Sequence, residues 1–229
     1  MRTELTNSNK RKGRKSAFSL VELMTVVSIM AILTAVASPG LKIAMLNAHQ
    51  NAAMGNARSI ALGLKTYAQD YEGVFPGFET EDGGKISTSN DAFRELIPDY
   101  IDSERVFMVR RSAWGNLADG RITEPEDRLE AGENHFAYIS GLLDTSISDW
   151  PLVVDGTNGS GTYTKTHGER GGCWEGRKAI VVTVGGSAYV TKMRGDADAR
   201  YIPRYGYPEE NALEVSAYMG EMAQLLDPE

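Results

Sequence analysis

The sequence predicts an α+β protein in which a long N-terminal helix packs on a small antiparallel sheet, with a further helix near the C-terminus. Three observations support this fold class. Residues 18–38 form an apolar run with one charge, Glu22, and helical spacing of apolar residues then continues to Tyr71. Much later, two β-rich runs flank Gly185 and Gly186, which is the pattern of a tight hairpin.

The apolar run at residues 18–38 has about the length that an α-helix needs to cross a bilayer. Residues 1–17 form a basic leader with six Lys and Arg residues and one acid. The positive-inside rule keeps such a leader in the cytoplasm and places residues 39–229 on the other side. Glu22 is the anomaly, because an acid at full membrane depth costs about 2 to 3 kcal/mol unless something compensates it.

The residues around Glu22 resemble the prepilin processing signal shared by type IV pilins and the pseudopilins of type II secretion systems. The resemblance rests on the basic leader, on the segment SAFSLVEL and on the spacing to Pro39. It implies that a prepilin peptidase cuts between Ala17 and Phe18, that Phe18 is then N-methylated, and that Phe18 and Glu22 act in assembly. Pro39 stands at the family's helix-kinking position, and Ala17 replaces the usual glycine before the cut.

Two other interpretations of this segment are weaker. An ordinary secretory signal has an apolar core of 7 to 15 residues followed by a small-x-small cleavage site, and this core is longer. An uncleaved single-pass anchor explains the length and the leader but not SAFSLVEL or the spacing from Glu22 to Pro39. The segment therefore predicts a prepilin-type N-terminus.

Beyond Pro39 the helical pattern continues for about 30 residues and leads into the expected head. The stripe predicted to pack on the head is Ala53, Ala57, Ile60, Leu64, Tyr67 and Tyr71. Asn56, Arg58, Lys65 and Gln69 fall between these positions and are expected to face water or a neighbouring subunit. The helix is expected to end at the segment YAQDYEGVFP, which resembles the end of the first helix in major pseudopilin-like proteins.

The remaining elements are read from local patterns. A short helix capped by Ser89 or Asn90 is expected to run to Ile97. Strands are predicted at residues 106–109, 136–139 and 152–154, and in the hairpin 179–184 and 187–193. Residues 79–84, 116–133 and 155–172 are expected to be loops, and residues 194–207 a connector rich in turns. The last helix is expected to begin at Pro208 and to bury Val215, Tyr218, Met219, Met222, Leu225 and Leu226.

The composition and the scattered histidines and cysteine argue against several other kinds of protein. The net charge of −7, which becomes more negative without the basic leader, argues against nucleic-acid binding. Cys173 is the only cysteine, so no intrachain disulfide can form. His167 and Cys173 lie in or beside a glycine-rich loop without a catalytic signature, and His49 is expected at a solvated or subunit-facing position. We therefore predict no catalytic residues and no cofactor. We also predict no metal site, since Asp196 and Asp198 alone do not specify a calcium site.

These observations predict a periplasmic pilin-like subunit, most closely a pseudopilin of a type II secretion system. Its parts are expected to be a leader at residues 1–17, a transmembrane half-helix at 18–38 and a head at 39–229, with the anchor in the inner membrane. The expected partners are prepilin peptidase, other copies and related pseudopilins, the inner-membrane secretion platform and membrane lipid. A type IV pilus subunit and a membrane-anchored periplasmic enzyme or binding module are the alternatives.

Overall fold

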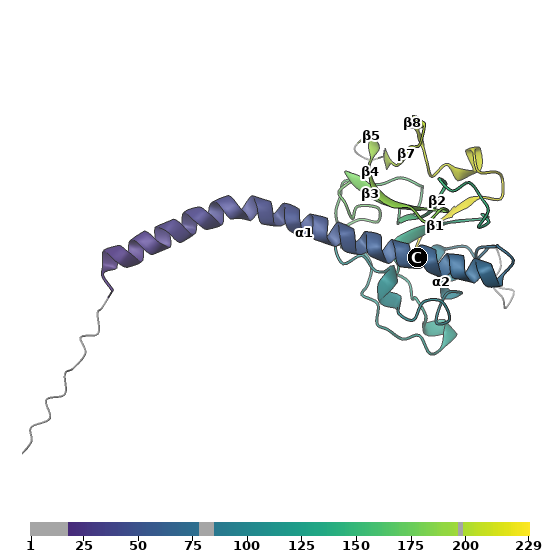
Figure 1. Cartoon of the computed structure of the whole chain (residues 1–229), viewed down its shortest axis with the longest axis horizontal. Helices are drawn as coiled ribbons and strands as arrows, with labels where there is room; N and C mark the ends of the chain where they lie inside the picture. The colour runs from purple at the N-terminus through teal and green to yellow at the C-terminus, as the bar shows by residue number, and fades with distance from the viewer. Residues whose placement is uncertain (1–17, 78–84, 197–198) are drawn as a thin grey trace, which may run out of the picture. The chain divides into compact units, whose positions relative to one another are not determined.

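A computed structural model describes residues 18–77, 85–196 and 199–229 of the chain. The chain divides into two compact units, Met1–Leu46 and Asn47–Glu229. One helix, α1 (Leu20–Asp70), contributes to both (Figure 1). The predicted leader with Ala17, the predicted loop at residues 79–84 and Asp198 lie outside the described residues.

The second half of α1 forms the spine of the head, as the periodic stripe predicts. Ala53, Ala57, Ile60, Leu64 and Tyr67 are all buried, whereas Asn56, Arg58, Lys65 and Gln69 are exposed or half-buried. The exception is Tyr71, which stays 38% exposed and stacks on Tyr67 with a ring-centroid distance of 4.1 Å. The helix ends at Asp70, one residue before Tyr71, so that this ring lies at the edge of the core and not within it.

A five-stranded antiparallel sheet forms the other main layer of the head. Its strands are β1 (Phe136–Ser140), β2 (Pro151–Asp155), β3 (Lys178–Thr183), β4 (Ala188–Lys192) and β9 (Gln224–Leu226), in the spatial order β4-β3-β2-β1-β9. The predicted strands 136–139 and 152–154 and the predicted hairpin are confirmed. Two contacts place the β3–β4 hairpin alongside α1: Lys178 Nζ donates to Gln50 Oε1 at 3.5 Å, and Arg58 donates to the carbonyl of Ala188 at 3.2 Å.

The strands β1 and β2 are buried at every position, so this part of the sheet is covered on both faces, whereas the edge strand β4 is exposed or half-buried. The glycine-rich segment predicted as a loop, residues 155–172, and the residues just after it supply part of this cover, because Tyr163 and Trp174 are buried. Tyr163 Oη donates to the carbonyl of Asp155 at 2.9 Å, and Trp174 Nε1 donates to the Asp155 carboxylate at 2.9 Å. The loop and the residues that follow it are therefore held against the end of β2 by two buried aromatic side chains, one from each.

On the other side of α1 lies a lobe that begins with the short helix α2 (Ser89–Arg94) (Figure 1). The predicted helix is present, but its N-cap is Thr88, whose hydroxyl accepts from Asp91 N at 3.2 Å in a capping box. Ser89 and Asn90, the predicted caps, are instead buried and both accept hydrogen bonds from Asn134 Nδ2. The helix also ends earlier than predicted, at Arg94.

The prediction of a strand at residues 106–109 is wrong. A 3₁₀ helix, η1 (Glu104–Phe107), covers the first two residues of this segment, and the other two have no regular structure. Phe107 is buried against Phe93, with 5.1 Å between ring centroids, and the Phe107 carbonyl accepts from His135 N at 2.9 Å. The segment is therefore held by core packing and by contacts with a distant loop, and it joins no sheet.

The prediction of a C-terminal helix from Pro208 to Leu226 is also wrong. This region contains β8 (Tyr207–Asn211), a 3₁₀ turn η3 (Val215–Ala217) and β9. Of the predicted stripe, Val215 is buried but Met222 is 63% exposed. Pairing with distant strands overrides the local helical spacing, since Leu226 lies opposite Tyr138 of β1.

The predicted connector at residues 194–207 forms most of two small hairpins. In the first, β5 (Arg194–Asp196) pairs with β6 (Ala199–Tyr201); in the second, β7 (Pro203–Arg204) pairs with β8. A second 3₁₀ turn, η2 (Pro125–Asp127), lies in the predicted loop at 116–133. The small hairpins follow β4 directly, so they extend the head beyond the edge of the main sheet.

Candidate processing and assembly site

The two predicted assembly residues, Phe18 and Glu22, lie at the start of α1, Phe18 just before the helix and Glu22 in its first turn. Phe18 is 83% exposed and precedes the helix. Ser19 N donates a hydrogen bond of 2.9 Å to Glu22 Oε2, and Leu23 N donates to the Ser19 carbonyl at 3.1 Å. Glu22 therefore satisfies one of the backbone donors that a helix leaves unpaired at its start, and its charge suits the positive end of the helix dipole.

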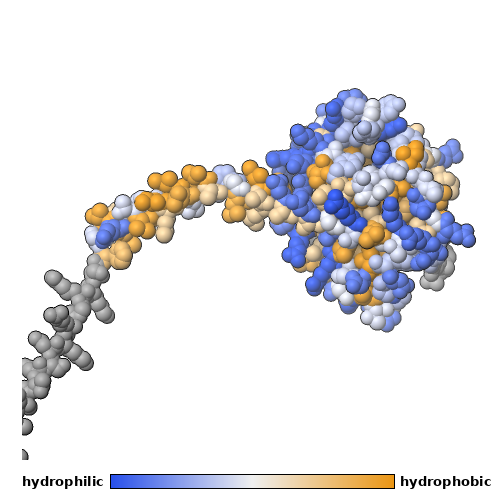
Figure 2. Space-filling model, viewed as in Figure 1, coloured by the Kyte–Doolittle hydropathy of each residue, from blue (hydrophilic) through white to orange (hydrophobic). Residues whose placement is uncertain are grey.

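The helix that follows Glu22 presents apolar side chains on all sides. Figure 2 shows this surface as a nearly continuous apolar stretch of residues, interrupted near its start by polar ones. Among the described residues, α1 is long and apolar enough to cross a membrane, and no part of its most apolar window is buried. Such an unpartnered surface is what lipid, or the equivalent helices of other subunits, covers.

The hydroxyl groups of the apolar stretch are satisfied within the helix. Ser28 Oγ donates to the carbonyl of Met24 at 2.7 Å, and Thr34 Oγ1 donates to that of Met30 at 2.8 Å. Thr25 makes the same kind of bond with Val21. Because each of these hydroxyls bonds to the carbonyl four residues earlier, it adds little cost to burial in hydrocarbon.

Pro39 lies inside α1, as the sequence places it. A proline has no N–H and clashes with the preceding turn, so it removes one helical hydrogen bond at this point. Gly40 follows it, and nothing lies within 4 Å of where its Cβ would be. This pair makes the helix easier to bend here than elsewhere, and the kink assigned to Pro39 stays a prediction.

The candidate nucleophile considered from the sequence lies in an inert setting. Cys173 is buried and free, and burial raises the pKa of its thiol, which disfavours the reactive thiolate. Within the described residues, no hydrogen bond joins Cys173 to a histidine. His135 is buried, with its Nε2 at 3.1 Å from the Trp114 carbonyl, and His49 on α1 is half-buried.

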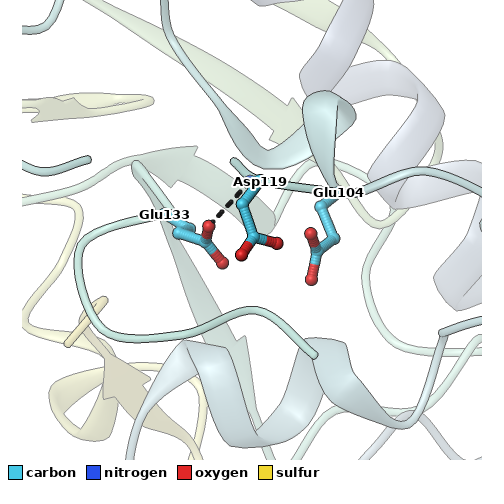
Figure 3. Close-up of side chains that lie close together, drawn as sticks. All are labelled: Glu104, Asp119 and Glu133. Carbon is cyan, nitrogen blue, oxygen red and sulfur yellow. Dashed lines mark hydrogen bonds between the residues drawn. The ribbon is translucent and has the colours of Figure 1, made fainter. Parts of the chain in front are cut away.

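Sequence reasoning did not link three carboxylates that the fold brings together, those of Glu104, Asp119 and Glu133 (Figure 3). One oxygen of each lies within 4.8 Å of the others, and Glu104 and Glu133 are buried. Oxygen atoms of this kind are the ligands that Ca²⁺ prefers. The three residues come from η1 and from the loop at 116–133, and their spacing carries no signature of a cation site.

Hydrogen bonds from the chain itself account for the oxygens of this acid cluster (Glu104, Asp119 and Glu133). Glu104 accepts from Leu129 N at 2.6 Å and from Gly120 N at 3.0 Å. Glu133 accepts from the backbone N–H groups of Asp119 and Glu130 at 2.9 and 2.8 Å. Arg121 donates to both oxygens of Asp119, and these bonds lower the Asp119 pKa. The cluster thus fastens the loop at 116–133 onto η1.

The N-terminal segment is also where the chain matches a known family model. Residues 12–38 match the prokaryotic N-terminal methylation motif, which is the prepilin-type signal of pilin and pseudopilin proteins. No curated protein matches the chain, and no solved structure matches it. The motif supports a type IV pilin-like subunit that a prepilin peptidase processes and that assembles with other pilin-like subunits. The family that carries it is structural and not enzymatic.

Proposed function

We propose that this chain, whose N-terminus carries the prepilin-type signal, is a pseudopilin of a type II secretion system. The observation that carries the proposal is the motif at residues 12–38, which runs directly into an exposed apolar helix that continues as the spine of the head. This arrangement suits a subunit that waits in the inner membrane with its head in the periplasm and then joins a filament rooted there.

The choice of a secretion system over a pilus rests on two features of the head. Cys173 is the only cysteine, so the head lacks the disulfide loop found in many type IV pilins. The segment YAQDYEGVFP, at the end of α1, resembles that of major pseudopilins. This segment is integral to the head, since Phe75 is buried and the Pro76 carbonyl accepts from Tyr138 Oη at 2.8 Å.

In the proposed mechanism, cleavage between Ala17 and Phe18 creates a positively charged amine on Phe18. Glu22 lies one helical turn further along and carries the opposite charge. When subunits assemble, the Phe18 amine of an incoming subunit neutralises Glu22 of its neighbour in apolar surroundings. The pairing offsets the penalty of burying either charge alone and sets the axial register between two adjacent helices. Filament growth from the secretion platform then pushes or gates exported proteins.

Intact-mass analysis of the protein extracted from membranes tests the processing step. We expect residues 1–17 to be missing and one methyl group to be present on Phe18. The Phe18→Ala variant is compared with the natural chain. The same mass analysis determines which residue of the variant carries a methyl group. A retained leader, or a cut beyond Ser38, contradicts the proposal.

A deletion strain separates the secretion system from the pilus. We expect loss of the chain to stop export of secreted enzymes into the medium while surface pili remain. The same strain complemented with the natural chain should recover export. Normal export combined with loss of pili would instead identify a type IV pilus subunit.

A further inference from the structure

A cleft with several aromatic side chains in its lining lies between the β7–β8 hairpin and strand β4. It consists of two adjoining hollows of about 640 and 210 Å³, which share Asp149, Tyr189 and Arg204 among their lining residues. We call this the aromatic cleft. The larger hollow is within the range of roughly 300 to 1,000 Å³ that small-molecule sites occupy.

Several side chains that line the aromatic cleft are held in place by contacts within the head, without a ligand. The guanidinium of Arg204 lies 4.1 Å from the ring centroid of Tyr218 and 4.4 Å from that of Tyr207. Tyr218 Oη donates to the Ala212 carbonyl at 2.6 Å, and its ring meets Trp150 edge-on with 6.3 Å between centroids. Stacked and hydrogen-bonded rings of this kind form a rigid surface. Ligand binding therefore costs little conformational entropy in these side chains.

The rim of the cleft exposes aromatic rings to water. Tyr205 is 88% exposed and Tyr189 is 43% exposed. Single exposed apolar groups are ordinary, but several aromatic faces around one concave surface mark a place where a ligand or partner stacks. The ligand must therefore offer flat apolar faces.

Charge pairing on the cleft argues for a neutral ligand. Arg194 is paired with Glu209 at 2.6 Å, and Arg204 is paired with Glu210 at 2.5 Å. Asp149, which lines both hollows, is exposed and has no hydrogen-bond partner among the described residues. The Asp149 carboxylate would repel an anion, and the charges of Arg194 and Arg204 are already paired with glutamates. A ligand that donates hydrogen bonds meets an open acceptor instead.

Thr183, at the end of β3, also lines the larger hollow. Its side chain is buried, with 3% of the residue exposed, yet its Oγ1 atom has no hydrogen-bond partner within the described ranges. A buried hydroxyl without a partner is unusual, because leaving it unpaired costs free energy. Two further residues with hydroxyl groups, Ser187 and Thr191, line the same hollow.

We propose that the aromatic cleft binds a neutral oligosaccharide. The C–H faces of the sugar rings stack on Tyr205 and Tyr189, and sugar hydroxyls donate to Asp149 and bond to Thr183. Sugars combine flat apolar faces with many hydroxyl donors and carry no charge, which is the combination that the rings, the carboxylate and the unpaired hydroxyl require. This site is separate from the N-terminal segment, so the head has a ligand of its own beyond its place in a filament.

Isothermal titration calorimetry tests the proposal with the full chain in a detergent that has no sugar headgroup. The probes are cellotetraose, maltotetraose and chitotetraose, and we expect at least one to bind with a Kd of about 1 mM or below. Tyr205→Ala and Asp149→Asn should each weaken that binding by about tenfold. Tyr205 is so exposed that its loss leaves the fold intact. The matched control is Tyr71→Ala, which removes an exposed ring outside the cleft and should bind as the natural chain does.

Thr183→Val supplies a second readout. Because the hydroxyl has no partner in the free head, we expect this substitution of similar shape to leave the melting temperature unchanged or higher while it weakens sugar binding. If Thr183 had only a structural role, the substitution would lower the melting temperature and leave sugar binding unchanged.

Several results would overturn the proposal. One is that none of the three oligosaccharides binds at up to about 10 mM. Another is that Tyr205→Ala and Asp149→Asn leave the affinity unchanged, or that only a sulfated oligosaccharide binds. Loss of self-association by Tyr205→Ala in sedimentation, without an effect on sugar, would assign the cleft to contacts between copies. Glu22→Ala should retain sugar binding, so failure of the filament proposal is distinguishable from failure of this one.

Discussion

Trp174 Nε1 donates a hydrogen bond of 2.9 Å to Asp155 Oδ2, and both side chains are buried in the head. The backbone N–H of Ile180 donates to the same oxygen at 2.6 Å, while the second carboxylate oxygen has no partner among the described residues. Burial raises the pKa of Asp155 from 3.8 to about 7, although the bonds from Ile180 and Trp174 oppose the rise. This acid therefore couples the stability of the head to pH.

The first prediction is that stability falls as pH rises from about 4 to 7 and then levels off. The folded head holds a proton on Asp155 in this range that the unfolded chain has lost, so folding is favoured at the acidic end. The contribution of Asp155 to the free energy of unfolding should decline by up to about 4 kcal/mol across this range. Asp155→Asn keeps an acceptor for Trp174 and should remove this part of the pH dependence. Melting temperatures of both proteins from pH 4 to 8 check it, and parallel curves would contradict it.

The second prediction concerns the acid cluster. Glu104→Ala leaves the buried N–H group of Leu129 and the N–H group of the exposed Gly120 without their acceptor, so it should lower the free energy of unfolding by about 1 to 3 kcal/mol. Glu104→Gln retains one acceptor and should cost less. Since the cluster's oxygens already accept hydrogen bonds, millimolar Ca²⁺ or EDTA should leave the melting temperature of the natural chain unchanged. A rise in melting temperature with Ca²⁺ would show that the cluster binds the cation.

The third prediction compares two glycines on α1. A Cβ on Gly63 would lie 2.9 Å from Ile101 Cγ1, whereas nothing lies within 4 Å of that position on Gly55. Gly63→Ala should therefore destabilise the head by about 1 to 3 kcal/mol through overpacking, against a gain of about 1 kcal/mol in helix propensity. Gly55→Ala adds only the gain in helix propensity, without overpacking, and should therefore raise the melting temperature. Equal effects of the two substitutions would mean that Ile101 moves aside without cost.

The fourth prediction tests the assembly role of Glu22. Glu22→Ala makes the segment more apolar, so membrane insertion and removal of the leader should persist. Filament formation, measured by cross-linking between subunits, and export should fall sharply, because the Phe18 amine loses its partner. The control is Glu221→Ala, which removes an exposed acid from the head. Normal filaments and normal export in Glu22→Ala would remove the main support for the proposed mechanism.

Elements that depend on local pattern were predictable from the sequence. The buried stripe on α1 follows from the spacing of Ala53, Ala57, Ile60 and Leu64, since a helical period is set within a few residues. Strands β2 and β3 follow from runs of β-branched residues bounded by Gly and Pro. The prepilin-type signal is likewise contiguous, and this is why it was recognisable without a structure.

Features that depend on distant contacts were not predictable. Ser89 and Asn90 are both good N-cap residues, but Asn134 requires them in the core, so Thr88 becomes the cap. The C-terminal segment has helical spacing, yet Leu226 pairs with Tyr138 in the sheet. The acid cluster and the aromatic cleft each combine residues from several elements, so no local sequence pattern predicts either of them.

The pairing of β9 with β1 has a consequence for how the head reaches its folded state as the chain is made. Tyr138 meets Leu226 only after the 87 residues between them have been made, and Asp227, just beyond β9, accepts two hydrogen bonds from Thr157. Contacts so remote in sequence form slowly, since the intervening chain must lose entropy before they contribute stability. The newly made chain therefore spends time with an incomplete sheet. During that interval the exposed edge of β1 is open to capture by a chaperone or to removal by a protease.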